Sequence, residues 1–332
     1  MTLKGSHAAC GPLACRESNL GPSGFLASLL SCSGSIPGSG TMTKHETEPA
    51  IKISHSQVLT WLSCKWKWKW AYLDRWTSKE KSHYLTQGNM MHELLAMYYS
   101  GKQNEVMPKL HEWANEPDKW QLVEKCAKLY TRYTEEFAPR EDAGWTTLAA
   151  EYYFSIVLRT PVGIPFELEG YVDQIKVKNG SIFVEDYKTH TARPWTDDMV
   201  QMDSQLPVYG AALKELGYTV NGVSILLLNM YDYKEQQPIE KMVKRIRHAP
   251  SQTEFSNILY QFGLAVDEIL FYRGMNENRY VKNLKKDCSL CQFQMPCLMD
   301  NKGIDATPFL MTNFEQRSKR ESETLANEEL NI

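Results

Sequence analysis

The chain has 332 residues, of which 42% are hydrophobic, and a formal net charge of −3. This length can bury one large core or two modest ones, and the near-neutral charge excludes a protein that coats polyanions over its whole surface. We expect a soluble protein, because the sequence contains no apolar run long enough to cross a bilayer. The eight cysteines are too few and too uneven for a disulfide scaffold, so the clustered ones predict metal ligands in a reducing compartment.

The two ends of the chain differ in composition from its middle. Residues 1–50 are rich in Gly, Ser and Pro and lack sustained periodicity, which predicts a disordered leader or extension. The alternative is a lipoprotein signal that ends at Cys32, although the apolar stretch before this residue is short and interrupted. Residues 311–332 are charged and weakly apolar, and we expect a mobile tail there.

Residues 51–147 are predicted to form a helical region. Between Ser54 and Trp76 the sequence has neither Gly nor Pro, and its apolar residues recur at helical spacing behind serines that can cap a helix. Two further helical patterns follow, over residues 90–99 and 120–137. This half of the chain is therefore expected to pack as helices.

The sequence C-K-W-K-W-K-W, residues 64–70, lies within the first of these helices. On a helix its tryptophans point to two sides, so they are expected either to pack in the core or to form an aromatic platform for bases. In the second case the neighbouring lysines would contact nucleic acid: Lys65, Lys67 and Lys69.

A β-rich region is predicted over residues 148–235. Residues 151–158 are rich in β-branched and aromatic side chains, which indicates a strand, and Asn179-Gly180 is a strong signal for a two-residue hairpin turn. We expect Glu151 to be a solvated carboxylate at the start of its strand, with assistance to a metal site as the alternative.

Counting outward from the Asn-Gly turn places Asp173 opposite Asp186 on one face of the hairpin, with Lys188 two residues farther along. Glu185 points to the other face. Two opposed carboxylates repel each other, so they require a divalent cation, a shared proton or the nearby lysine. The same face carries an apolar patch next to the turn, formed by Ile175, Val177, Ile182 and Val184.

Asp173 followed by Asp186-Tyr187-Lys188 resembles the signature of the PD-(D/E)XK nucleases, specifically of their RecB-like branch. Gly88-Asn-Met-Met-His92 resembles the helical G-x-x-x-H element of that branch, in which the histidine binds a metal ion. Imidazole beside carboxylates makes Mn²⁺ competitive with Mg²⁺. Taken singly, each of these groups could also be an ordinary polar residue of the surface or core.

Gln205-Leu-Pro-Val-Tyr209 resembles the Q-x-x-x-Y element that follows the D-x-K strand in the same branch. On a helix its two polar residues share one face and could both reach the DNA backbone or the lysine. Pro207 would break a helix interior, so the helix is expected to begin near Ser204 or to bend there. The alternative is a tyrosine buried beside its glutamine.

Cys288, Cys291 and Cys297 form a C-x2-C-x5-C cluster, and metal sites of this kind usually have four ligands. One cysteine before the nuclease core and three behind it resemble the iron-sulfur subset of the RecB-like nucleases, the AddB and CRISPR-adaptation types, in which Cys64 would be the fourth ligand. The resemblance favours a structural 4Fe-4S cluster, with Zn²⁺ as the alternative. The sequence departs from that subset at Lys65, where a proline often follows the first cysteine.

The resemblance implies an α/β fold with the restriction-endonuclease-like core, a central mixed sheet flanked by helices, and an iron-sulfur staple near the C-terminus. Residues 236–310 would then form C-terminal helices and the cysteine cluster. It also implies a DNA exonuclease that uses Mg²⁺ or Mn²⁺, because divalent ions polarise a phosphate and activate water.

Roles for single residues follow from the same resemblance. Lys188 would position or activate the attacking water, and the scissile strand would be oriented by Gln205 and Tyr209. The implied metal ligands are His92, Asp173, Asp186 and the backbone carbonyl of Tyr187. Contacts to phosphates are predicted for Lys282, Lys285 and Lys286, although these could equally be solvated.

The expected substrate is single-stranded DNA or DNA with free ends, in recombination, repair or end processing, with room for a helicase or recombinase partner. The expected location is the cytoplasm, or the host cytoplasm for a viral protein. Three alternatives remain open: a structure-specific endonuclease, a non-catalytic iron-sulfur or zinc module that binds nucleic acid, and a metalloprotein with redox or zinc-dependent chemistry.

Overall fold

A mixed β-sheet lies at the centre of the computed structural model, which describes residues 51–80, 83–190, 196–230, 237–274 and 280–317. Its strand order is β1-β4-β5-β6-β7. Strands β1 and β5 pair with different parts of one edge of β4, and β3 pairs with the other edge. The strands are β1 (Ile51–Ser54), β3 (Thr146–Arg159), β4 (Pro165–Lys178), β5 (Ser181–His190), β6 (Val220–Asn229) and β7 (Val243–His248). The predicted leader, residues 1–50, lies outside the described residues.

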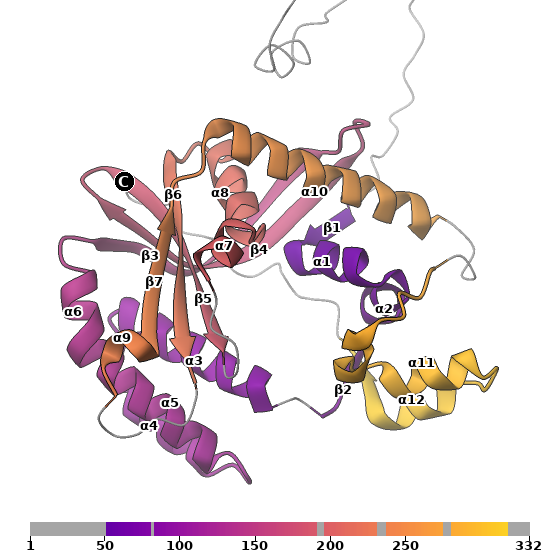
Figure 1. Cartoon of the computed structure of the whole chain (residues 1–332), viewed down its shortest axis with the longest axis horizontal. Helices are drawn as coiled ribbons and strands as arrows, with labels where there is room; N and C mark the ends of the chain where they lie inside the picture. Colours follow the sequence, from indigo (N-terminus) through magenta and orange to yellow (C-terminus); the bar gives the residue numbers. More distant parts are fainter. Residues whose placement is uncertain (1–50, 81–82, 191–195, 231–236, 275–279, 318–332) are drawn as a thin grey trace, which may run out of the picture. The chain divides into compact units, whose positions relative to one another are not determined.

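Helices cover both faces of this sheet (Figure 1), which confirms the predicted α/β architecture. One face packs against α1 (His55–Ser63), α8 (Gln205–Glu215) and α10 (Gln252–Arg273). The opposite face packs against α3 (His83–Tyr99), α4 (Gln103–Ala114), α5 (Trp120–Arg132), the π-helical turn η4 (Tyr133–Phe137), α6 (Ala138–Glu141) and α9 (Ile239–Met242). A short helix, α7 (Asp197–Gln201), precedes α8. None of the described helices combines the length and apolarity that a membrane crossing requires.

Strand β6 separates the two cores. Ile225 and Leu227 belong to the core under α8 and α10, whereas Leu226 and Leu228 belong to the core under α3 and α5. Successive side chains of a strand point to opposite faces, so a strand covered on both sides needs apolar residues at every position. The nearly continuous apolar run of β6 therefore follows from its central place in the sheet.

The Asn-Gly hairpin forms as predicted. Asn179 and Gly180 both have positive φ angles, 51° and 77°, which is the backbone that a two-residue hairpin turn requires. Lys178 pairs with Ser181, and pairing continues outward to Gln174 and Glu185. All four predicted members of the apolar patch pack in the core under α8: Ile175, Val177, Ile182 and Val184.

The predicted single helix over residues 54–76 is divided at Cys64, which is a correction. Its backbone is extended (φ −164°, ψ 114°), and its sulfur accepts a hydrogen bond from the Lys67 N–H at 3.5 Å, which caps a new helix. Arg75 then adopts a positive φ of 63°, so the chain turns and Trp76 begins a strand. The segments are α2 (Lys65–Trp68), the π-helical turn η3 (Lys69–Leu73) and β2 (Trp76–Ser78).

Two of the three tryptophans of this stretch, Trp68 and Trp70, pack in the interior, as the core alternative predicts, whereas Trp66 is only partly buried. Trp68 joins the core under α8 and α10, whereas Trp70 joins a third core with Phe293 and Phe314. The helical segment thus connects two separate cores. The third core is completed by α11 (Gln294–Asn301), α12 (Thr307–Asn313) and β8 (Phe314–Gln316), and the 3₁₀ turn η6 (Lys286–Leu290) precedes α11.

The prediction of a mobile tail from residue 311 is wrong for residues 311–316, which belong to α12 and β8. Residue 311 lies within α12, and β8 pairs antiparallel with β2. The burial of Phe314 in the third core holds this segment, and the Arg317 N–H donates to the Arg75 carbonyl at 2.8 Å. Residues 318–332 lie outside the described part of the chain.

A buried ionic network lies on the face of the sheet that α3 and α5 cover, and it joins the β4–β5 hairpin to β7. Glu185 is fully buried and forms ion pairs with Lys176 and Arg245, whose side chains are also buried. Arg245 continues to Asp142 at 2.7 Å, and Ser224 donates to Glu185 at 2.6 Å. Although burial by itself opposes ionisation, Arg245 and Lys176 hold the pKa of Glu185 at about 2, so this carboxylate stays charged.

Replacement of Glu185 by alanine should destabilise the fold strongly, because it leaves two buried cations without their counter-charge. We expect the free energy of unfolding in urea to fall by about 3–5 kcal/mol. The matched control is Glu141→Ala, which breaks the exposed ion pair with Arg247 and should change this quantity by about 0–1 kcal/mol. Equal losses in the two variants would contradict the role assigned to the network.

Candidate active site

The candidate site lies where β5 separates from β4. Strand β3 occupies one edge of β4 along its length, so β1 and β5 share the other edge and leave a gap between Glu169 and Gln174. Asp173 lies in this gap. Its Oδ2 accepts a hydrogen bond from the Tyr187 N–H at 2.6 Å, so a side chain replaces the strand carbonyl that would otherwise pair there. The predicted opposition of Asp173 and Asp186 falls one step beyond the last regular pair.

Helix α3 brings His92 to Asp173. The G-x-x-x-H spacing puts Gly88 and His92 on the same face of the helix. A Cβ atom at Gly88 would lie only 3.1 Å from the Thr189 hydroxyl, so a glycine allows α3 to approach β5 closely. His92 Nδ1 then lies 3.2 Å from Asp173 Oδ1, and its ring contacts the Tyr187 ring edge-on.

Glu151 completes the cluster, which favours the alternative of assistance to a metal site over that of a solvated carboxylate. The neighbouring pairs, Ala150 with Gln174 and Tyr152 with Val172, place Glu151 across from Asp173. Ligand atoms of His92, Glu151 and Asp173 all lie within 4.8 Å of one another, so Glu151 is part of a potential metal site and not merely a solvated strand end. Strand register contained this signal, whereas the positive φ of Glu151, 51°, could not be read from the sequence.

The charges of this cluster are strongly coupled. Although burial opposes it, the Asp173 carboxylate raises the pKa of His92 to about 9. The pKa of Glu151 is raised to about 7 by loss of solvent around its carboxylate and then by the negative charge of Asp173, even though much of this residue is exposed. Burial, together with Asp173, also raises the pKa of Asp186 to about 7. The carboxylates thus repel one another, and positive charge among them is favourable.

Lys188 lies beside this cluster and forms an ion pair with Asp186. Asp186 is not a member of the group formed by His92, Glu151 and Asp173. The ammonium is 2.8 Å from Asp186 Oδ2 and donates to Gln205 Oε1 at 2.8 Å. Although burial opposes it, Asp186 raises the pKa of Lys188, so the lysine is charged. The structure therefore brings together the D-x-K strand and the first residue of the Q-x-x-x-Y element.

Helix α8 carries Gln205 at its start and Tyr209 one turn later. It begins at Gln205 with Ser204 as its N-cap, so Pro207 lies in the first turn, where a missing N–H is tolerated. Tyr209 is buried and its ring contacts Phe154 edge-on. The ring belongs to the core under α8, as the alternative of a buried tyrosine predicts.

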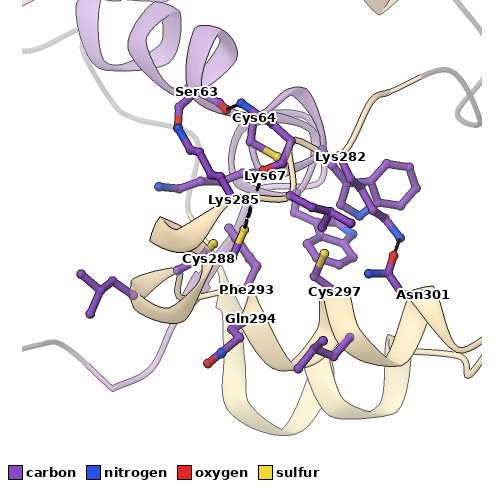
Figure 2. Close-up of a pocket in the computed structure, with 17 residues that line it drawn as sticks. Ser63, Cys64, Lys67, Lys282, Lys285, Cys288, Phe293, Gln294, Cys297 and Asn301 are labelled. Atoms are coloured by element: carbon purple, nitrogen blue, oxygen red, sulfur yellow. Dashed lines mark hydrogen bonds between the residues drawn. The ribbon is translucent and has the colours of Figure 1, made fainter.

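The four predicted cysteine ligands line one cavity of about 310 Å³. Cys64 enters it from the break between α1 and α2, Cys288 from η6 and Cys297 from α11 (Figure 2). Cys291 lies in the segment between η6 and α11. The remaining predicted core thiol, Cys126, is fully buried elsewhere, under α3.

Backbone contacts hold the two sides of this cavity together. The Asn283 side chain donates to the Ser63 carbonyl at 2.7 Å, and the Trp66 N–H donates to the Val281 carbonyl at 3.2 Å. The Lys285 N–H donates to Cys288 Sγ at 3.4 Å, which repeats the contact that Lys67 makes with Cys64 Sγ. Among the described residues, no three sulfur atoms lie within 4.8 Å of one another.

The predicted nucleic-acid lysines divide into two groups. Lys65 forms an ion pair with Glu268, Lys69 is buried against Asp74, and Lys282 forms an ion pair with Asp300. These three have partners within the protein, which weakens the prediction that they contact DNA. Lys67 and Lys285 lie at the cysteine cavity, and the side chain of Lys286 lies outside the described part of the chain.

No curated protein matches the chain. Among solved structures, a protein from Eubacterium rectale with a provisional exonuclease description is 14% identical, with a TM-score of 0.45 over 78% of this chain and 99% of its own. The protein SSO0001 is 11% identical, with a TM-score of 0.31 over 62% of this chain and 83% of its own. Likenesses this distant add nothing to a family assignment.

A family model for the PD-(D/E)XK nuclease superfamily also matches the chain. It covers residues 52–298, from β1 through the last of the clustered cysteines, and thus includes each element that forms the candidate site. The chain belongs to the PD-(D/E)XK nuclease superfamily.

Proposed function

We propose that the chain is a metal-dependent deoxyribonuclease of the RecB-like branch that digests DNA from its ends, with a preference for single strands. The observation that supports hydrolysis is the meeting of His92, Glu151 and Asp173 beside the Asp186–Lys188 ion pair. Phosphodiester hydrolysis needs an oriented water and positive charge near the attacked phosphate, and these residues can supply both. The preference for ends and for single strands rests on the resemblance to the RecB-like branch.

The donor set fits a divalent cation. Carboxylate oxygens suit Mg²⁺ and Mn²⁺, and one imidazole beside them favours Mn²⁺ as the alternative to Mg²⁺. Asp173 already uses Oδ2 for the Tyr187 N–H and turns Oδ1 toward His92, so its second oxygen faces the other ligands. A cation bound here would polarise the phosphate and lower the pKa of a bound water. Asp186 and the Tyr187 carbonyl are proposed to complete the ligand set.

Lys188 is the proposed catalytic cation. An ammonium has three N–H donors, and Asp186 and Gln205 account for two directions. A third donor can reach the attacking water or a phosphate oxygen and offset the negative charge that develops there. Gln205 thus acts by fixing the orientation of the lysine. The buried Tyr209 is proposed to support Gln205 by anchoring α8 in the core.

The cysteine cavity is proposed to hold a 4Fe-4S cluster. Four cysteine thiolates suit both a structural Zn²⁺ and a 4Fe-4S cluster, and the resemblance to the iron-sulfur subset of the RecB-like nucleases favours the cluster. The N–H donors to Cys64 and Cys288 suit sulfurs that carry negative charge. The proposed role is structural, because the cavity ties α1 and α2 to α11.

Removal of the Lys188 ammonium should abolish most of the activity. With end-labelled single- and double-stranded DNA and Mg²⁺ or Mn²⁺, we expect Lys188→Ala to lower kcat by about 10²–10³-fold, because positive charge near the transition state is lost. The control is Lys178→Ala, a lysine of the same hairpin that donates to the Ala143 carbonyl and lies over the Trp145 ring. Digestion by Lys188→Ala at the wild-type rate, or no digestion by either protein, would contradict the proposal.

Glu151 should contribute to metal affinity. We expect Glu151→Gln to weaken Mn²⁺ binding about tenfold in calorimetric titrations, because a charged oxygen ligand becomes neutral. The titration is best made at pH 8, where a carboxyl with a pKa of about 7 is mostly ionised. Glu93→Gln is the matched control, because Glu93 lies one residue from His92 but pairs with Lys109 at 3.3 Å. Equal affinities of Glu151→Gln and the control would exclude Glu151 as a ligand.

Cys64 should be required for the cluster even though it lies far from the other thiols in sequence. We expect Cys64→Ser, purified without oxygen, to lose its iron, its broad visible absorbance and several degrees of melting temperature. Cys126→Ser, which changes a thiol buried elsewhere, should keep its iron. A wild-type protein with one zinc and no iron would overturn the assignment.

A further inference from the structure

A buried histidine outside the proposed metal site connects α1 to α8. His55 is the first residue of α1 and is only 3% exposed. Its Nε2 lies 2.9 Å from the Ser204 hydroxyl, across a sequence separation of 149 residues. Its ring stacks on Phe262 at 6.2 Å and meets Tyr209 edge-on at 6.1 Å, so the imidazole is held in one orientation.

Ser204 passes this contact to the proposed catalytic lysine. It is the residue before Gln205, whose side-chain oxygen accepts a hydrogen bond from Lys188 at 2.8 Å. The Ser204 hydroxyl makes no capping bond to the α8 backbone, and the Gln205 N–H donates to Asp203 Oδ1 at 2.9 Å. The hydroxyl therefore contributes to the position of the helix start through His55 and not through capping.

The environment keeps this contact neutral. Burial lowers the pKa of His55 to about 4, so the ring is uncharged near pH 7 and adds no repulsion to Lys188. A neutral imidazole carries one N–H and one acceptor nitrogen, which suits a hydroxyl that can donate or accept. A buried polar pair that joins two helices restricts their relative position more closely than an apolar contact would.

We propose that His55 is a positioning residue for Lys188. Through Ser204 it fixes the first turn of α8, and thereby the Gln205 amide that holds the lysine ammonium in place. The inference rests on the nuclease function proposed above. Misplacement of a catalytic group by about 1 Å can lower a rate by about 10²-fold, so a contact at this remove can control kcat without touching the substrate.

The test compares variants that cut the contact at either end. His55→Phe keeps an aromatic ring between Phe262 and Tyr209, and Ser204→Ala removes only the hydroxyl. We expect each to lower kcat for end-labelled DNA about tenfold, with KM and melting temperature little changed. Ser204→Thr, which retains a hydroxyl, should restore most of the rate. Ser56→Ala is the control, because that serine bonds Ser54 at the same end of α1 and should leave kcat unchanged.

The coupling to Gln205 decides between positioning and general packing. In a Gln205→Ala background we expect His55→Phe to cause no further loss, and the double variant of His55→Phe with Ser204→Ala to match either single variant. Wild-type rates in both single variants, or the same tenfold loss in the Gln205→Ala background, would overturn the inference while leaving the nuclease proposal intact. A wild-type protein that cleaves none of the DNA substrates would instead overturn the proposed function, and the inference with it.

Discussion

The candidate site depends on one hydrogen bond, from the Tyr187 N–H to the Asp173 carboxylate. At this point β5 stays with β6 while β4 turns away toward β1, and this separation would leave the Tyr187 N–H without a partner from β4. A buried N–H that is not bonded is unfavourable, so the side chain stabilises the separation of the strands. The same separation opens the space into which His92 and Lys188 extend. Asp173 thus both accepts the Tyr187 N–H and forms part of the candidate metal site.

Two adjacent acidic residues of β5 serve opposite purposes because a strand alternates its faces. Glu185 points to the side of the sheet that α3 and α5 cover, where Arg245 and Lys176 neutralise it and hold its pKa at about 2. Asp186 points to the other side, where burial and Asp173 raise its pKa to about 7. The first carboxylate is already satisfied by fixed cations. The second lies among other carboxylates, in surroundings that favour an added positive charge.

Helix α1 runs between the two candidate metal sites. It begins at His55, which contacts the start of α8, and it ends at Cys64, which lines the cysteine cavity. The tryptophans beyond Cys64 extend this connection, because Trp68 and Trp70 anchor the following helical segments in separate cores. A cluster that fixes Cys64 would therefore also restrain the helix that reaches toward Lys188. Lys65, Lys69 and Lys282 support this junction through ion pairs.

The sequence by itself determined the features that depend on local rules. The Asn179-Gly180 turn fixed the hairpin register, and register alone placed Asp173 near Asp186 and Glu185 on the opposite face. Pro207 in a first turn and the apolar patch beside the hairpin followed from equally local constraints. The tertiary structure decided what depends on distant segments. Glu151 joined His92 and Asp173 through a strained backbone angle, the helix broke at Cys64, and Phe314 anchored the presumed tail. His55 met Ser204 across 149 residues. Such contacts form only when separate helices pack against one sheet, and no spacing within a single segment encodes them.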